Sequence, residues 1–210
     1  MSIVKLNNKA VSNATAFGSI SSLGSMVFIK KLTASSSATL SFVDGASGVV
    51  LDDTYKEYVF TFKDIHPSAN ANLEFNATTD GSNYNVVKTS TAFYVEHEED
   101  DGSGQMGYSG IDEAQATGFQ QLTTGSYPST DNDASIVGNL HIFNPSNTTF
   151  VKHFISRTTF YGENNADRSS NSGHVAGYFN TTSALTGFQF KMRSGNLDAG
   201  KIKLYGIKDS

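Results

Sequence analysis

The fold is decided by residues 187–207, which read GFQFKMRSGNLDAGKIKLYGI. Phe188, Phe190 and Met192 alternate with polar residues, and the same alternation returns at Ile202 after a glycine-containing connection. A period of two is typical of β-strands with one apolar and one polar face. We therefore predict a two-stranded hairpin here, whose apolar face must be covered by a second layer.

The same alternation recurs along the chain from Met26 onward, in short segments separated by turns rich in Gly, Asn, Asp and Pro. The connections are unequal in length, and no repeat of fixed period appears, which argues against a propeller or a β-helix. The pattern predicts a single all-β domain over residues 26–210, an antiparallel two-sheet sandwich of jelly-roll type. Residues 98–135 are predicted to form a long surface excursion with one short helix, and 163–172 a polar loop.

Composition limits the classes of function. The chain has 210 residues with 15 Phe, 9 Tyr, no Trp and no Cys, so its core is predicted to be aromatic and without disulfides. The net charge of −5 argues against sequence-independent binding of nucleic acid, which needs a basic surface. No segment approaches the roughly 18 apolar residues of a membrane span, so we expect no membrane insertion. The first residues lack the apolar core of a signal peptide, and synthesis and folding in a cytoplasm are expected.

Residues 1–25 are rich in Ser, Asn and Gly and carry isolated apolar residues. We predict an extended docking arm that contacts its own domain or a neighbour through Phe17, Ile20 and Leu23. A disordered tail is the alternative.

The sequence offers no catalytic signature, and we predict no catalytic residue, no cofactor and no metal site. Its five histidines lack the spacing of zinc or HExxH sites, and no Gly-x-Ser-x-Gly motif is present. His141 and His153 are expected to face one another on paired strands as a structural pair. The acidic run 98–101 has oxygen ligands that Ca²⁺ prefers, but it lacks the spacing of an EF-hand, which favours a solvated loop.

Two tyrosines are poorly explained by core packing. Tyr108 and Tyr127 lie in the Gly- and Ser-rich excursion, outside any strand pattern. Tyrosine combines a large apolar surface with a hydroxyl and is common in protein interfaces. We predict that these two residues contact a partner.

Strand and turn phrases over most of the chain form a recognisable set. They read IKKLTASSS (29–37), SFVDG (41–45), IHPSA (65–69), FNPS (143–146), AGY (176–178), NTT (180–182), SGN (194–196) and GKIKLYGI (200–207). In content and order they resemble a family of small virion structural proteins encoded by tailed phages, particularly those of marine cyanobacteria. The resemblance implies a component of the particle and carries over no catalytic residue.

We therefore expect a non-enzymatic structural protein that is assembled in the host cytoplasm and located in the virion. Its partners would be other capsid or tail proteins, and the symmetry of a particle favours a homo-oligomer such as a trimer. An accessory protein that decorates the particle surface is preferred, because the chain lacks the coiled-coil or collagen-like shaft of a free-standing fibre. A tail module that binds a receptor or a host surface glycan is the alternative, and a polysaccharide lyase or hydrolase is disfavoured.

Overall fold

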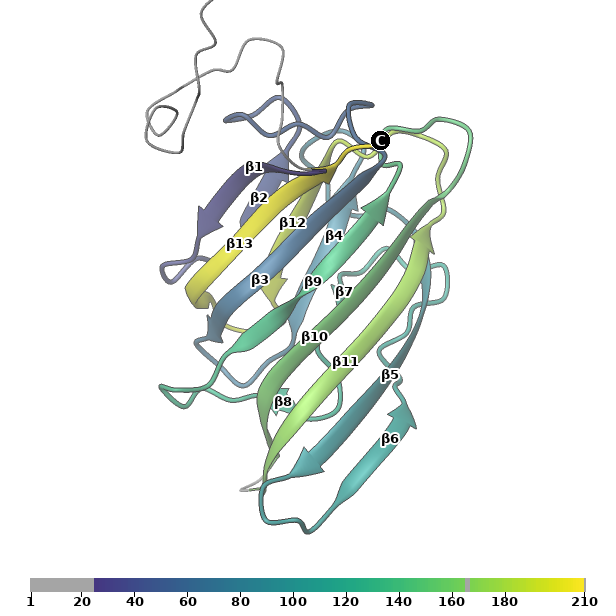
Figure 1. The fold of residues 1–210 in the computed structure, drawn as a ribbon. Coiled ribbons are helices and arrows are strands. Elements are labelled where there is room, and N and C mark those ends of the chain that lie inside the picture. Colours follow the sequence, from purple (N-terminus) through teal and green to yellow (C-terminus); the bar gives the residue numbers. More distant parts are fainter. Residues whose placement is uncertain (1–24, 165–166, 210) are drawn as a thin grey trace, which may run out of the picture.

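The protein is an all-β antiparallel sandwich of two sheets, as predicted (Figure 1). The computed structural model describes residues 25–164 and 167–209, and within these it contains strands and no helix. The strands are β1 (Met26–Thr33), β2 (Leu40–Val43), β3 (Glu57–Pro67), β4 (Leu73–Thr78), β5 (Lys88–Glu98), β6 (Gly104–Tyr108), β7 (Gln120–Gln121), β8 (Tyr127–Pro128), β9 (Ile136–Phe143), β10 (Lys152–Asn164), β11 (Asp167–Phe179), β12 (Gly187–Met192) and β13 (Leu197–Ile207).

The two sheets differ in width. The large sheet has nine strands in the order β1-β13-β3-β9-β10-β11-β5-β6, with β8 paired beside β10. The small sheet has four strands in the order β2-β12-β4-β7 and lies behind the large sheet in Figure 1. Every pairing is antiparallel, so each strand runs opposite to its neighbours.

The hairpin predicted over residues 187–207 is wrong, although both of its strands exist. β12 belongs to the small sheet between β2 and β4, whereas β13 belongs to the large sheet between β1 and β3. The connection 193–196 therefore carries the chain from one layer to the other, and the apolar faces of the two strands meet across the core.

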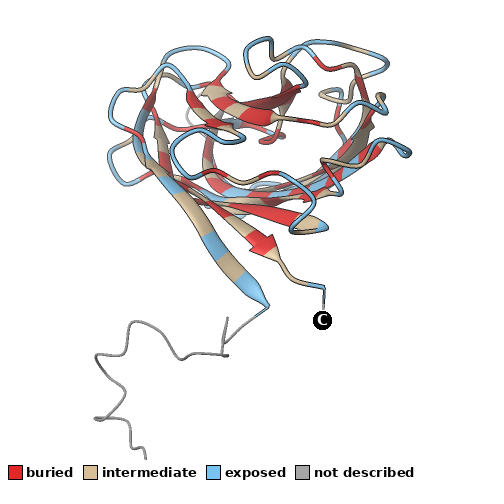
Figure 2. Cartoon of the chain, turned by 90° about the horizontal axis from the view of Figure 1, so that it is seen from above, coloured by how far each residue is buried: buried red, intermediate tan, exposed pale blue. Residues whose placement is uncertain are grey.

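The core is a layer of aromatic rings between the sheets. Phe190 of β12 is fully buried, and the centre of its ring lies 5.0–6.2 Å from the centres of four others, those of Phe42, Phe60, Phe62 and Phe75. Inclined and edge-to-face rings of this kind add to the free energy gained from burying apolar area. Figure 2 shows the buried residues between the two layers, while β1, which joins the grey trace, alternates between intermediate and exposed residues.

Two segments differ from their predicted structure. The predicted polar loop 163–172 is wrong, because β10 and β11 remain paired as far as Asn164 and Asp167. The excursion 98–135 contains the strands β6, β7 and β8, and the predicted helix is absent from it. Polar residues occupy inward positions here, so the apolar alternation that marks a strand is missing from the sequence.

Hydrogen bonds replace apolar packing behind β11. The side-chain amide of Asn171 donates to Ser126 Oγ at 2.8 Å, and its oxygen accepts from the Ser126 amide at 3.3 Å. Thr158 Oγ1 donates to the Leu122 carbonyl at 2.7 Å. Among the described residues, no buried side-chain nitrogen or oxygen lacks a hydrogen-bond partner. The bonds of Asn171 and Thr158 attach residues 122–126 to the inner side of β10 and β11.

Lys88, at the start of β5, is buried in this polar region. Its Nζ donates a hydrogen bond to the Gly118 carbonyl. Burial lowers the pKa of Lys88 to about 8, and the charges of Glu113 and Glu74 oppose this shift only in part. The ammonium form is therefore less favourable in the folded chain than in the unfolded chain.

Replacing Phe190 by Ala removes the ring that joins the aromatic layer. We expect Phe190→Ala to lower the free energy of unfolding by about 3–5 kcal/mol, because it loses buried apolar area and leaves a cavity. Phe150→Ala is the matched control, since the Phe150 side chain is 69% exposed. Denaturant unfolding of both variants measures the difference, and equal losses would contradict the central place of Phe190.

The buried lysine predicts a pH dependence of stability. Between pH 8 and the ordinary lysine pKa of 10.5 the unfolded chain holds more protons at Lys88 than the folded chain. The penalty for burying the ammonium is fully present below pH 8 and is relieved as the pH rises through this window. The difference in unfolding free energy between wild type and Lys88→Met should therefore shift in favour of wild type, by at most about 3 kcal/mol. Lys201→Met, at an exposed position, should show no such shift from pH 7 to 11.

Candidate functional site

The outer face of the large sheet, which is turned away from the small sheet, is the principal surface of interest. Its residues follow from the alternation along each strand: on β10, His153, Ile155, Arg157 and Thr159 are exposed, whereas Phe154, Ser156, Thr158 and Phe160 are buried. This alternation was predicted from the sequence and is confirmed. Outward residues of neighbouring strands pair in register, so the outer face is a continuous surface.

Large apolar side chains are exposed on five strands of the outer face, β1, β9, β10, β5 and β6. Exposed fractions run from 40% to 75% for a set that reaches from β1 to β6: Met26, Phe28, Phe93, Val95, Met106, Tyr108, Val137 and Ile155. Some of them are direct cross-strand neighbours, such as Phe93 with Tyr108 and Val95 with Met106. The solvent face of an antiparallel sheet is ordinarily polar, so this apolar stripe marks an interaction surface.

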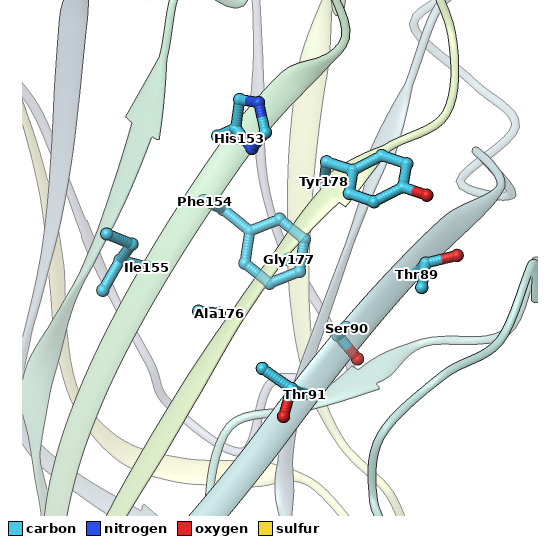
Figure 3. Close-up of a pocket in the computed structure, with 9 residues that line it drawn as sticks. All are labelled: Thr89, Ser90, Thr91, His153, Phe154, Ile155, Ala176, Gly177 and Tyr178. Atoms are coloured by element: carbon cyan, nitrogen blue, oxygen red, sulfur yellow. The ribbon is translucent and has the colours of Figure 1, made fainter.

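A hollow of about 470 Å³ lies on this face over β5, β10 and β11 (Figure 3). We call it the outer-face hollow; its lining comprises Thr89, Ser90, Thr91, His153, Phe154, Ile155, Ala176, Gly177 and Tyr178. The rings of His153 and Tyr178 lie 6.0 Å apart at one end. A smaller hollow of about 130 Å³ continues past Ala176 to Phe93 and His174, whose rings stack with centres 4.5 Å apart.

A small outward residue of β11 opens the outer-face hollow, and a glycine follows it on the inward side of the strand. Ala176 lies between Ile155 and Thr91 of the neighbouring strands, and its methyl group leaves the space above it open. At Gly177 a Cβ would come within 2.4 Å of the Thr89 carbonyl oxygen and 2.7 Å of the Phe154 ring. Glycine is therefore required for the close approach of β5 to β11 at this point.

The chemistry of the outer-face hollow is weakly polar. Its outward side chains supply hydroxyls from Thr89, Thr91 and Tyr178, together with the ring of His153. Burial, and secondarily the charge of Arg157, lowers the pKa of the neighbouring His174, which favours the neutral imidazole. This arrangement suits an uncharged ligand with hydroxyl groups or an apolar protein surface.

A second hollow of about 470 Å³, near the turn between β5 and β6, is acidic. Its lining includes His97, Glu98, Glu99, Asp133 and Tyr161. Among the described residues, no group of three His, Cys, Asp or Glu side chains is placed to hold a metal ion. The negative charge gathered here makes this end of the sheet unfavourable for anions.

The structure describes two of the five residues that were predicted to contact a partner. Tyr108 lies on β6, is 67% exposed and donates a hydrogen bond to Asp112 at 2.9 Å. Tyr127 lies on β8, is 52% exposed and pairs with Glu163. Both are thus available to a partner, and contact by them stays a prediction. The predicted arm with Phe17, Ile20 and Leu23 lies outside the described residues, apart from its last residue.

The predicted pairing of His141 with His153 is wrong. The register of β9 and β10 places His141 opposite Ile155, and its Nδ1 lies 2.5 Å from Glu57 Oε1. His153 contacts Tyr178 of β11 instead. Sequence reasoning placed Ile155 on the face opposite Phe154, but it missed that Ile155 and Phe93 belong to one apolar surface. The signal was an apolar side chain at a position that alternates with the core residues of the same strand.

Comparisons with known proteins do not indicate a function, so the geometry of the structure is the main guide. Within the described residues there is no helix long and apolar enough to cross a membrane. No family model matches the chain, and comparison with curated proteins and with solved structures gives no significant match.

Proposed function

We propose that this chain is a non-enzymatic structural protein that docks on other proteins through the outer face of its large sheet. Its setting would be the surface of a tailed-phage particle, where it serves as an accessory or decoration protein after assembly in the host cytoplasm. The resemblance of its strand and turn phrases to virion structural proteins supports this setting. The apolar stripe on the outer face supports the docking role.

The apolar stripe is the observation that carries the proposal. Ile155, at the middle of the stripe, is 53% exposed, and Phe93 on β5 is 44% exposed. Burying a large apolar side chain against a partner gains about 1.5–3 kcal/mol. A stripe with members on five strands can therefore supply the apolar centre of a stable interface, surrounded by the polar threonines and lysines of the same face.

Charges placed within the stripe should prevent docking. We expect Ile155→Glu combined with Phe93→Glu to remove the protein from particles, because two carboxylates would be desolvated in the interface. Co-purification of the tagged chain with particles, in cells that propagate the encoding phage, measures the effect. Phe150→Glu is the matched control, because Phe150 is 69% exposed but lies in the turn between β9 and β10. Undiminished incorporation of the folded double variant would exclude the outer face as the docking surface.

Glycan binding is a second candidate, and the outer-face hollow favours it. Tyr178 offers an aromatic ring on which a sugar can stack, and its cross-strand neighbour Thr89 and the nearby Thr91 offer hydroxyls. The small side chain of Ala176 leaves the space above it open. The chain would then act as a receptor-binding module of the tail.

A glycan array with the purified protein separates the two candidates. If the chain binds a host glycan, Tyr178→Ala should weaken binding about tenfold or more, because the stacking surface is lost. Tyr205→Ala is the control, since Tyr205 also lies on a strand of the large sheet, β13, but is absent from the hollow. A decoration protein should bind neither the array nor host cells, and this result would exclude the second candidate.

A further inference from the structure

The large sheet has two edge strands, β1 and β6, whose outer backbone groups are open to pairing. Among the strands of residues 25–164 and 167–209, β1 pairs only with β13, and β6 pairs only with β5. An edge strand leaves a row of backbone N–H and C=O groups that can pair with another strand. Each edge also carries exposed apolar side chains, Phe28 at 55% on β1 and Met106 at 75% on β6.

The directions of the two edge strands suit mutual pairing. Eight strands lie along the path from β1 to β6, and each runs opposite to the next. Because the number is even, β1 and β6 of one chain run in opposite directions. A second copy that continues the sheet with the same orientation therefore presents its β1 antiparallel to β6 of the first.

The charges at the two edges are complementary. Lys31 on β1 and its neighbours Lys201 and Lys203 on β13 lie towards the Thr33 end of β1, and within the described residues none of the three forms an ion pair. Around β6 the turn after β5 carries Glu98, Glu99, Asp100 and Asp101 next to Gly104. Arg168 nearby is paired with Asp131 at 3.2 Å, which leaves the turn acidic.

Antiparallel pairing brings the complementary ends together. The Lys31 end of β1 meets the Gly104 end of β6, where the acidic turn begins. The Met26 and Phe28 end then meets the Tyr108 end, so apolar side chains face apolar side chains. Pairing of β1 with a second β1 would instead gather lysines, a common protection against self-association of edges.

We propose that the β1 edge of one copy pairs with the β6 edge of a second copy, which extends the large sheet from chain to chain. A contact between two different surfaces of identical chains is head-to-tail, and it closes into a ring when the rotation per copy allows. This inference rests on the proposed structural function, since it names a second copy as one of its protein partners. It concerns the edges, whereas docking on the particle concerns the middle of the outer face.

Cross-linking between single-cysteine variants tests the pairing, because the natural chain has no cysteine. Phe28→Cys and Met106→Cys are made in separate full-length chains, which are treated with a short bifunctional maleimide alone and as an equal mixture. We expect a covalent dimer in the mixture at about ten times the yield of either variant alone, the ratio that distinguishes a head-to-tail contact from a symmetric one. Thr159→Cys, exposed at the middle of the face on β10, is the control and should not cross-link to Phe28→Cys.

Charge reversal provides a second, independent measurement. Lys31→Glu with Lys201→Glu, and separately Glu99→Lys with Asp100→Lys, should each weaken self-association about tenfold in light scattering, and raised salt should weaken it in the wild type. Combining all four substitutions in one chain should restore association, because the charges are complementary again.

Several results would overturn the proposal. They are a monomeric wild-type protein at the concentrations used for cross-linking, cross-linking of either variant with itself as efficiently as in the mixture, and association that the charge reversals leave unchanged. A failure here with normal incorporation into particles would reject the edge contact alone. Loss of incorporation in the outer-face variants with intact cross-linking would reject the docking surface alone.

Discussion

The need to bury aromatic rings between two sheets controls the rest of this structure. Phe190 of the small sheet packs among rings from both layers, including Phe60 and Phe62 of the large sheet. Once these rings point inward, the alternation along each strand fixes which residues point outward. A shift of one residue in β10 would place Phe154 in solvent and Ile155 in the core. The apolar residues of the stripe on the outer face therefore come in addition to those that the core requires.

The unequal width of the sheets explains where polar groups are buried. The small sheet packs against the Phe179 end of β11 through Phe75 of β4, and the segment 109–126 is bonded to the inner side of β10 and β11 farther along. A segment with little regular structure brings many backbone polar groups, and these must find partners when they are buried. Asn171 bonds to Ser126 of this segment, and the buried Lys88 donates to its Gly118 carbonyl. The polar region thus positions the very strands that carry the outer-face hollow.

The sequence predicted the strands and their inward faces better than their pairing. A period of two shows which residues of a strand share a face, so Phe188 and Phe190 were identified as core residues. It does not report the sheet to which a strand belongs, and for this reason β12 and β13 were wrongly paired. The outer-face hollow is lined by residues of β5, β10 and β11, and only the register brings Thr91, Ala176 and Ile155 together. The order of residues along the chain does not predict such a site. The exposure of Tyr108 could be predicted, because this residue lies in a Gly- and Ser-rich segment outside the alternating pattern.

The edges and the middle of the outer face form parts of one surface. Phe28 lies opposite Tyr205 on the β1 edge, and Tyr108 lies opposite Phe93 beside the β6 edge. Joining the two edges would therefore make the apolar stripe continue from one copy to the next, with the lysines and the acidic turn along one margin. Repetition strengthens binding through weak contacts. Once one copy of an assembly is bound, binding of the next copy is effectively intramolecular. A stripe that is modest on a single chain then becomes a strong docking surface on an assembly, which is the arrangement that a particle built from repeated subunits can use.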